Sequence, residues 1–281
     1  MAAKLGNKEL VGQFQCINRI ESWKSRDSFP HFLLVVGDEG SGRKTLSYLF
    51  AQELNARVST VPDVSVASIR RLISIAYEID SKIVYLIPNA DSMSLAAKNS
   101  LLKLTEEPPE NAYIILTLES MENTLPTLVS RSQHLVLEPY TSPQLSELTS
   151  NKNISDIADN PGMVEKLEAI APESLSSMID TCDKLTRYID KVTVANALKS
   201  AQKIKFKDSD KSEMDLNLFL SIMSYALNKC KSEQDLLYRV CIWLRCIAKH
   251  RPALKRAGVN KRALYDKMIF EVRANLMQGG S

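Results

Sequence analysis

The stretch FLLVVGDEGSGRKT, residues 32–45, decides how the chain is expected to fold. FLLVV is short and continuously apolar, which is typical of a strand that is buried on both faces of a parallel sheet. A glycine-rich turn follows, and then TLSYLFAQEL (45–54) with the apolar spacing of an amphipathic helix. Strand, glycine loop and helix in this order are the context of a phosphate-binding loop. Gly37, Gly40 and Gly42 would let backbone N–H groups turn toward phosphate at the positive end of the helix dipole.

The loop departs from the pattern G-x-x-x-x-G-K-[ST] at its chemically important end. Arg43 stands at the lysine position and Lys44 at the Ser/Thr position, so that Thr45 comes one residue late. Arginine is planar and bulkier than lysine, and a lysine side chain cannot ligate Mg²⁺. Asp38 and Glu39 add carboxylates that would repel phosphate. The sequence predicts a loop of the right shape with weakened or absent nucleotide binding, and a working variant loop is the alternative.

The third expected strand, KIVYLI (82–87), ends without the acidic pair that ATP hydrolysis requires. In a hydrolase of this type, an Asp at that place holds Mg²⁺ and a following Glu orients the attacking water. Pro88 and Asn89 occupy these two positions, and neither side chain can do that chemistry. Asp91 lies two residues beyond Asn89, where we expect no more than a helix cap. Because both motifs are degraded, we expect no hydrolytic centre and no metal site in this chain.

From about residue 8 to 138 the chain alternates strands with helices, which predicts an α/β fold with a doubly wound parallel sheet. After Pro139 only helical patterns follow. We expect an α/β domain at 1–139, a helical lid at 140–203 and an all-helical domain at 204–281, with the polar stretch 204–213 as a linker. The other strands are expected at 57–61, 112–118 and 134–138, and helices at 10–24, at 65–79 with Ser65 as N-cap, and at 94–107.

In the C-terminal region, residues 233–250 have the pattern of an amphipathic helix. We place its apolar stripe on five residues: Leu237, Val240, Cys241, Leu244 and Ile247.

Composition excludes several classes of protein. Hydrophobic residues make up 44% and charged residues 25%, as in ordinary globular proteins, and a net charge of +3 does not by itself argue for a nucleic-acid partner. No apolar stretch approaches the roughly 18 residues that a membrane span needs, and the first residues lack the core of a signal peptide. The five cysteines form no CxxC pair, which argues against a zinc site or a disulfide framework and favours reduced thiols in the cytoplasm.

Four ordered segments resemble the clamp-loader branch of the AAA+ proteins: LVGQ (10–13), PHFLLVVGDEGSG (30–42), AAKNSLLKLTEEPPENAYIILT (96–117) and LPTLVSRSQ (125–133). The resemblance is strongest to the delta-prime subunits of the bacterial DNA polymerase III clamp loader. It implies a P-loop AAA+ sheet, a small helical lid and a helical collar through which subunits join. In that family, hetero-pentamers use ATP to open a sliding clamp and close it around primed DNA.

The resemblance also implies a role for Arg131. Each ATP in the family lies at a subunit boundary, and the neighbouring subunit supplies an arginine from a Ser-Arg-Cys motif. Ser130, Arg131 and Ser132 stand at that position, so Arg131 is the implied arginine finger, acting in trans with Ser130 beside it. A plain surface arginine is the alternative interpretation.

Three further positions follow from the same resemblance. Thr117 stands where the family keeps its sensor 1 polar residue, and Met163, in NPGM, replaces the sensor 2 arginine of active ATPases. Arg70 matches a family arginine that contacts the DNA backbone, although a solvated helix face is an equally good interpretation of Arg70 and Arg71. The four-cysteine zinc module of most relatives is missing, because Asn55 leads almost directly into the next strand.

Together these features imply a stator, a subunit that completes its neighbour's ATP site without using its own. ATP and Mg²⁺ would belong to the neighbouring ATPase subunits, although residual ATP binding by this chain is compatible with the loop. The expected setting is the cytoplasm of a bacterium, with the chain encoded by the bacterium or by its phage.

Three alternatives stay open. The first is an ATPase-active motor subunit in which Arg43 or Lys44 contacts the phosphates and Thr45 the metal; nucleotide binding by the isolated chain separates it from the stator. The second is a clamp-opening subunit, against which Arg131 argues because that type usually lacks the arginine; direct binding to the clamp would identify it. The third is an AAA+ scaffold outside replication, which would not associate with clamp-loader ATPases.

Overall fold

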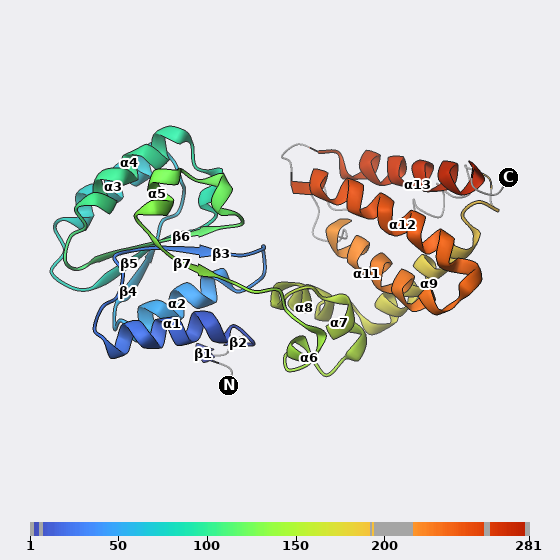
Figure 1. Cartoon of the computed structure of the whole chain (residues 1–281), viewed down its shortest axis with the longest axis horizontal. Coiled ribbons are helices and arrows are strands. Elements are labelled where there is room, and N and C mark those ends of the chain that lie inside the picture. The colour runs from blue at the N-terminus through green and yellow to red at the C-terminus, as the bar shows by residue number, and fades with distance from the viewer. Residues whose placement is uncertain (1–2, 6–7, 192, 194–215, 256–258, 279–281) are drawn as a thin grey trace. The chain divides into compact units, whose positions relative to one another are not determined.

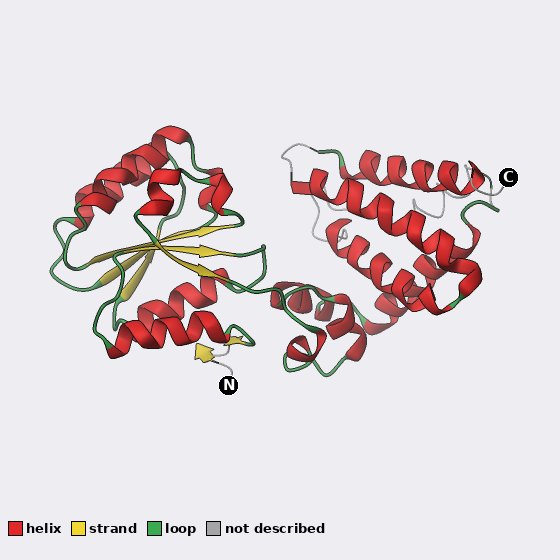
Figure 2. Cartoon of the chain, in the orientation of Figure 1, coloured by secondary structure: helices red, strands yellow, loops and turns green. Residues whose placement is uncertain are grey.

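The computed structural model describes residues 3–5, 8–191, 193, 216–255 and 259–278. The chain forms two compact units, one of Met1–Ser150 with Asn160–Gly162 and one of Asn151–Asp159 with Met163–Ser281. In the described ranges the strands lie in the first unit, and the regular elements of the second are helical (Figure 2). The expected linker at 204–213 and the boundary at 203/204 lie outside the described residues, so the division into three domains stays a prediction.

The first unit is built on a five-stranded parallel sheet in the order β4-β5-β6-β3-β7 (Figure 1). Its strands are β3 (Phe32–Val36), β4 (Arg57–Thr60), β5 (Ile83–Ile87), β6 (Ala112–Leu118) and β7 (Gln133–Val136). The strand expected from FLLVV is β3, which lies between β6 and β7. Because all five strands run the same way, the loops that leave their carboxyl ends meet along one edge of the sheet.

Helices cover both faces of this sheet, which confirms the doubly wound α/β fold (Figure 1). Leu33 and Val35 of β3 pack in one apolar core and Leu34 and Val36 in the other, so each face of this strand is buried. The first core lies under α1 (Phe14–Ser25) and α2 (Arg43–Glu53); the second lies under α3 (Val66–Ala76), α4 (Leu95–Glu106) and α5 (Pro126–Ser130).

The first residues of two helices test the boundaries predicted from the sequence. Ser65 caps α3 as predicted, because its hydroxyl accepts from the Ser68 N–H. The helix expected at 10–24 begins only at Phe14, and that boundary was wrong. Leu10 ends β2 (Lys8–Leu10), which pairs antiparallel with β1 (Ala3–Leu5), and Gly12 has a φ of +74°, which no α-helix accommodates.

The second unit packs its helices around a large aromatic core. Trp243 and Tyr265 are fully buried, and the rings of Phe219 and Tyr265 meet edge to face at 5.4 Å. The helices of this region are α7 (Lys152–Ile157), α8 (Pro161–Glu168, whose first two residues belong to the first unit), α9 (Pro172–Tyr188), α11 (Leu216–Lys229), α12 (Leu237–His250) and α13 (Lys261–Gln278); the short α6 (Ser142–Leu145) lies in the first unit.

The apolar stripe predicted for α12 was wrong in three of its five positions. Leu237 and Cys241 are exposed and Leu244 is half-buried. The buried residues of the helix are Val240, Ile242, Trp243, Cys246, Ile247 and His250. The helix is rotated so that the indole of Trp243, its largest apolar surface, faces the core, since burial of that ring contributes more than burial of a leucine.

Within the described ranges, no helix combines the length and the apolarity that crossing a bilayer would take.

An ion pair joins the end of α9 to α12. Both guanidinium nitrogens of Arg239 donate to the Asp190 carboxylate, at 2.5 and 2.6 Å, and the two side chains are about one-fifth exposed. The hydrogen bonds from Arg239 lower the pKa of Asp190 below its ordinary value. A carboxyl group whose pKa is lower in the folded state contributes stability above its unfolded pKa, near 3.9, and loses it as pH falls through the folded pKa.

We therefore predict that Asp190→Ala costs about 1 kcal/mol of unfolding free energy near neutral pH, and that this difference shrinks steadily below about pH 4. Urea unfolding at a series of pH values measures it. Asp180→Ala, at an exposed aspartate of α9, the helix that ends shortly before Asp190, is the control and is expected to change stability by less than about 0.5 kcal/mol. An Asp190→Ala cost that does not depend on pH would show that the charge of Asp190 contributes nothing.

Candidate functional site

The glycine loop connects β3 to α2 and turns through two left-handed residues. Gly40 has a φ of +84° and Gly42 a φ of +99°, conformations that favour glycine. The Gly37 N–H donates to the carbonyl of Leu118 at 3.1 Å, so the loop leaves the sheet still bonded to β6. Gly42 is the N-cap of α2, and its carbonyl accepts from the Leu46 N–H at 2.9 Å. The loop thus has the backbone turn of a phosphate-binding loop.

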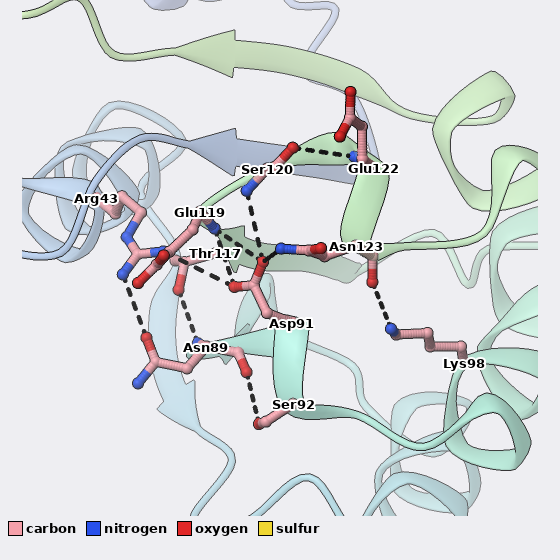
Figure 3. Close-up of polar contacts among 10 residues, drawn as sticks. All are labelled: Arg43, Asn89, Asp91, Ser92, Lys98, Thr117, Glu119, Ser120, Glu122 and Asn123. Carbon is pink, nitrogen blue, oxygen red and sulfur yellow. Dashed lines mark hydrogen bonds and ion pairs between the residues drawn. The ribbon is translucent and has the colours of Figure 1, made fainter. Parts of the chain in front are cut away.

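Arg43, the residue at the lysine position, is turned inward. Its side chain is only 8% exposed, one guanidinium nitrogen (Nη2) donates to Asn89 Oδ1 at 3.3 Å, and the other (Nη1) lies 4.0 Å from Asp91 Oδ2 (Figure 3). Arg43 therefore bridges the loop to the carboxyl end of β5. Lys44 is exposed and Thr45 is half-buried on the first turn of α2.

Asp91 has a larger role than the helix cap that the sequence suggested. The cap of α4 is Ser94, whose side chain accepts from the Ala97 N–H, so the expectation for Asp91 was wrong. Asp91 lies in a short 3-10 turn, Ala90–Ser92, and its carboxylate accepts from the Glu119 N–H at 2.9 and 3.0 Å and from the Asn123 amide at 3.0 Å. It joins the end of β5 to the segment that follows β6 (Figure 3).

Asn89 and Thr117 form the rest of this network. Asn89 has a φ of +51°, which asparagine tolerates better than most residues, and its N–H donates to Thr117 Oγ1 at 3.0 Å. The Asn89 carbonyl in turn accepts from the Ser92 hydroxyl at 2.8 Å. Thr117 is fully buried in β6, so the hydroxyl at the sensor 1 position holds the backbone of the turn after β5 (Figure 3).

Arg131 lies at the other edge of the sheet. It follows α5 and comes two residues before β7, at the amino ends of the strands, whereas the glycine loop follows the carboxyl end of β3. Its side chain is 38% exposed, Nη1 donates to the Thr127 carbonyl at 3.1 Å, and Nη2 pairs with Glu106 at 3.1 Å. Ser130 beside it is exposed, and its hydroxyl donates to the same carbonyl. The structure therefore does not bring Arg131 together with Arg43, Lys44 or Thr45.

The remaining candidates are dispersed. Arg70 is exposed on α3, and Met163 is buried at the start of the second unit. Ser132 is buried and its hydroxyl donates to the Val129 carbonyl at 2.9 Å. Among the described residues, no cluster of three or more His, Cys, Asp or Glu side chains could hold a metal ion.

Two residues around the loop escaped sequence reasoning. The buried Gln13 makes a two-point contact with Glu138, donating to its carbonyl at 2.9 Å and accepting from its N–H at 2.8 Å. The hydroxyl of Tyr140 donates to the Ser41 carbonyl at 2.7 Å, and burial raises the pKa of Tyr140 to about 12. The motif LVGQ includes Gln13 but does not indicate its partner, and no sequence pattern predicts the contact of Tyr140.

The bond between Thr117 and Asn89 can be tested by isosteric substitution. Thr117→Val removes the acceptor and keeps the shape, so we predict a loss of about 1–2 kcal/mol of stability and a smaller loss for Thr117→Ser, which keeps a hydroxyl. The control is Thr124→Val, because the buried hydroxyl of Thr124 has no hydrogen-bond partner among the described residues. Thermal unfolding gives both values, and equal costs for the two valine variants would rule out a structural role for the Thr117 hydroxyl.

Comparison with known proteins places this fold. A family model described as "DNA polymerase III, delta subunit" matches residues 64–141. The DNA polymerase III subunit tau of Bacillus subtilis (strain 168) is 21% identical over 302 aligned residues, which cover 94% of this chain and 54% of tau. The DNA polymerase III subunit delta' of the same organism is 34% identical over 74 residues, which cover 26% of this chain and 22% of delta'.

Among solved structures, a DNA polymerase III gamma-subunit-related protein from Thermotoga maritima matches with a TM-score of 0.50 and 15% identity, over 91% of this chain and 98% of that one. That likeness concerns the fold alone. The chain spans about half the length of tau and a smaller part of delta'. With its parallel sheet and its glycine loop, the chain is similar over part of its sequence to DNA polymerase III subunits, and its fold is like that of the gamma-subunit-related protein.

Proposed function

We propose that the chain is a delta-prime-like stator of a bacterial clamp loader. It would join ATPase subunits in a cytoplasmic hetero-pentamer and help load the sliding clamp onto primed DNA, as part of the DNA polymerase III holoenzyme. The observation that carries the proposal is the placement of two arginines. Arg43 is buried and bonded to the carboxyl edge of the sheet, whereas Arg131 is accessible at the opposite edge.

The carboxyl edge of the sheet supports the loss of ATP hydrolysis. Mg²⁺ in such a site needs carboxylate oxygen at the end of β5, and the attacking water needs a residue that orients it. The only acid in the turn after β5 is Asp91. Its carboxylate already accepts hydrogen bonds from three donors, the Glu119 and Ser120 N–H groups and the Asn123 amide, and the Arg43 guanidinium lies 4.0 Å away. A guanidinium at that place repels a divalent cation. Asn89 offers an amide oxygen that accepts from Arg43.

The topology supports an action of Arg131 on a neighbour's nucleotide. β7 and β3 run parallel, with Leu33 beside Gln133 and Val36 beside Val136. The four residues of β7, at about 3.3 Å each, separate the two edges by roughly 13 Å. Arg131 therefore lies at the edge of the sheet opposite to the glycine loop of its own chain. An arginine that stabilises phosphate charge from this edge has to serve a nucleotide held by another subunit.

The helical C-terminal unit supports assembly with other subunits. On α13, Phe270 and Met277 are 46% and 61% exposed and lie two helical turns apart on one face. Exposed apolar side chains on one helical stripe are suited to burial against another subunit, which fits the proposed collar. The contact of Arg70 with DNA stays a weaker part of the proposal.

An ATPase-active motor subunit is the second candidate. The sequence match to the tau subunit favours it, because that match extends over 94% of this chain. In that case Lys44, which is exposed, or Thr45 would have to reach the nucleotide although each lies one residue later than the usual pattern.

Nucleotide binding by the chain alone separates the two candidates. Under the stator proposal we predict that calorimetry detects no binding of ATP up to about 1 mM with Mg²⁺, and that phosphate release stays at background. Arg43→Lys combined with Lys44→Thr rebuilds the phosphate-loop pattern without changing its length and serves as the comparison variant. Turnover by the unmodified chain would favour the motor subunit instead.

The role of Arg131 is tested in the reconstituted complex with the ATPase subunits and clamp from the same genome. Arg131→Ala is expected to change stability by less than about 0.5 kcal/mol, because its ion pair is exposed, and to lower clamp-dependent ATP hydrolysis by about 10-fold or more. Arg26→Ala is the matched control, since Arg26 is also exposed and caps a helix with the same backbone angles, φ −99° and ψ 0°. Loading rates that are equal for both variants would remove the arginine finger from the proposal.

A further inference from the structure

Three consecutive carbonyls of the glycine loop accept hydrogen bonds from residues far along the chain. The Glu39 carbonyl accepts from the Asn160 side-chain amide at 3.2 Å, the Gly40 carbonyl from the Gly162 N–H at 2.9 Å, and the Ser41 carbonyl from the Tyr140 hydroxyl at 2.7 Å. All of these residues belong to the first compact unit. We call this set of three hydrogen bonds the loop clasp.

The two glycines of the clasp are in direct contact. A Cβ atom on Gly162 would lie 2.6 Å from the Cα of Gly40, and a Cβ on Gly40 would lie 2.5 Å from the Asn160 side-chain oxygen. Contacts this short leave room only for glycine at both positions, and Gly40 also needs it for its positive φ. The segment Asn160–Gly162 is therefore fitted to the loop by shape as well as by hydrogen bonds.

The loop is held from the sheet side as well. Arg43 ties its last turn to Asn89 and Asp91, and Leu10 packs against Gly42, where an added Cβ would lie 2.9 Å from the leucine methyl carbon. A loop that binds nucleotide offers its N–H groups to phosphate oxygens, whereas the clasp uses the loop's carbonyls, so the clasp fixes the shape of the loop without using those donors. In this chain, side chains and backbone of the same molecule make contacts on both sides of the loop.

We propose that the glycine loop has a structural role: it is held by Tyr140 and by the segment Asn160–Gly162, and it keeps one conformation with or without nucleotide. We call this arrangement the joint. The inference rests on the proposed loss of ATP hydrolysis, and it assigns the loop a structural role in place of nucleotide chemistry. It fixes the start of α8, which begins at Pro161, to the loop between β3 and α2. A nucleotide then has no loop movement to induce, which is the behaviour expected of a stator.

Amide hydrogen exchange in the full-length chain, followed by NMR, tests the joint. Gly162 N–H donates to Gly40, and Ser41 N–H donates to the Asp38 carbonyl within the loop, so both amides report on the clasp. Without nucleotide we expect both to exchange at least about 100-fold more slowly than in an unstructured peptide. Adding Mg·ADP at about 1 mM should change the rates by less than about twofold; because a chain that binds no nucleotide gives the same result, the slow exchange without nucleotide carries the test.

Tyr140→Phe removes the hydroxyl that donates to Ser41 and keeps the ring. We expect exchange of both amides to become about 5- to 10-fold faster, as the loss of one hydrogen bond implies. The matched control is Tyr48→Phe. The Tyr48 hydroxyl lies on the exposed side of α2, and its contact with Thr60 Oγ1 is weak because the distance of 3.5 Å is the longest that a hydrogen bond allows. Gly162→Ala should open the loop further, and Tyr140→Phe carries the test if that variant does not fold.

The outcomes separate this inference from the proposed function. Fast exchange without nucleotide, or equal rates in Tyr140→Phe and Tyr48→Phe, overturns the joint whatever the chain does with ATP. Protection that appears only when Mg·ADP is added also overturns it. ATP turnover by a chain whose loop exchange stays slow and unchanged would overturn the stator and leave the joint standing.

Discussion

The first unit depends on a single buried guanidinium. Arg43 reaches from the glycine loop to the end of β5, and its contacts with Asn89 and Asp91 link the loop after β3 to the turn where metal chemistry would take place. A buried cation is tolerated only where carboxylate and amide oxygens face it. The turn after β5 supplies the Asn89 amide oxygen at 3.3 Å and the Asp91 carboxylate at 4.0 Å, and among the described residues Nη1 of Arg43 makes no hydrogen bond.

Further hydrogen bonds connect the loops at the carboxyl edge of the sheet. Asp91 accepts from the backbone after β6, and Thr117 in β6 accepts from the backbone of Asn89, so the ends of β5 and β6 are connected in both directions (Figure 3). Each of these side chains stands at or next to a position that hydrolysis would require. Their hydrogen-bonding groups are used to hold loops together, which is consistent with the proposed loss of chemistry.

The sheet could be predicted from sequence because its signal is local. β3 and β6 are continuous apolar runs, and every residue of both is buried, so composition alone indicates strands covered on two faces. The cap at Ser65 was equally local. The roles of Asp91 and Tyr140 could not be predicted, because their partners, Glu119 and Ser41, lie 28 and 99 residues away. The prediction of the buried face of α12 was wrong for a related reason, because the face that is buried depends on what Trp243 packs against.

The positions of the two arginines are compatible with the proposed function, in which the chain lacks one activity and has another. Parallel strands place the glycine loop at one edge of the sheet and the segment before β7 at the other, so changes at the first edge do not alter the geometry of the second. Arg43 can replace lysine because its new partners are within the same unit, and the cost of that replacement is confined to the chain's own nucleotide site. Arg131 is held only by Thr127 and by the exposed Glu106, a pair whose net strength is about 1 kcal/mol or less. Under the proposed function, a contact that weak can be exchanged for a phosphate on a neighbouring subunit, whereas Arg43 is buried against its own chain.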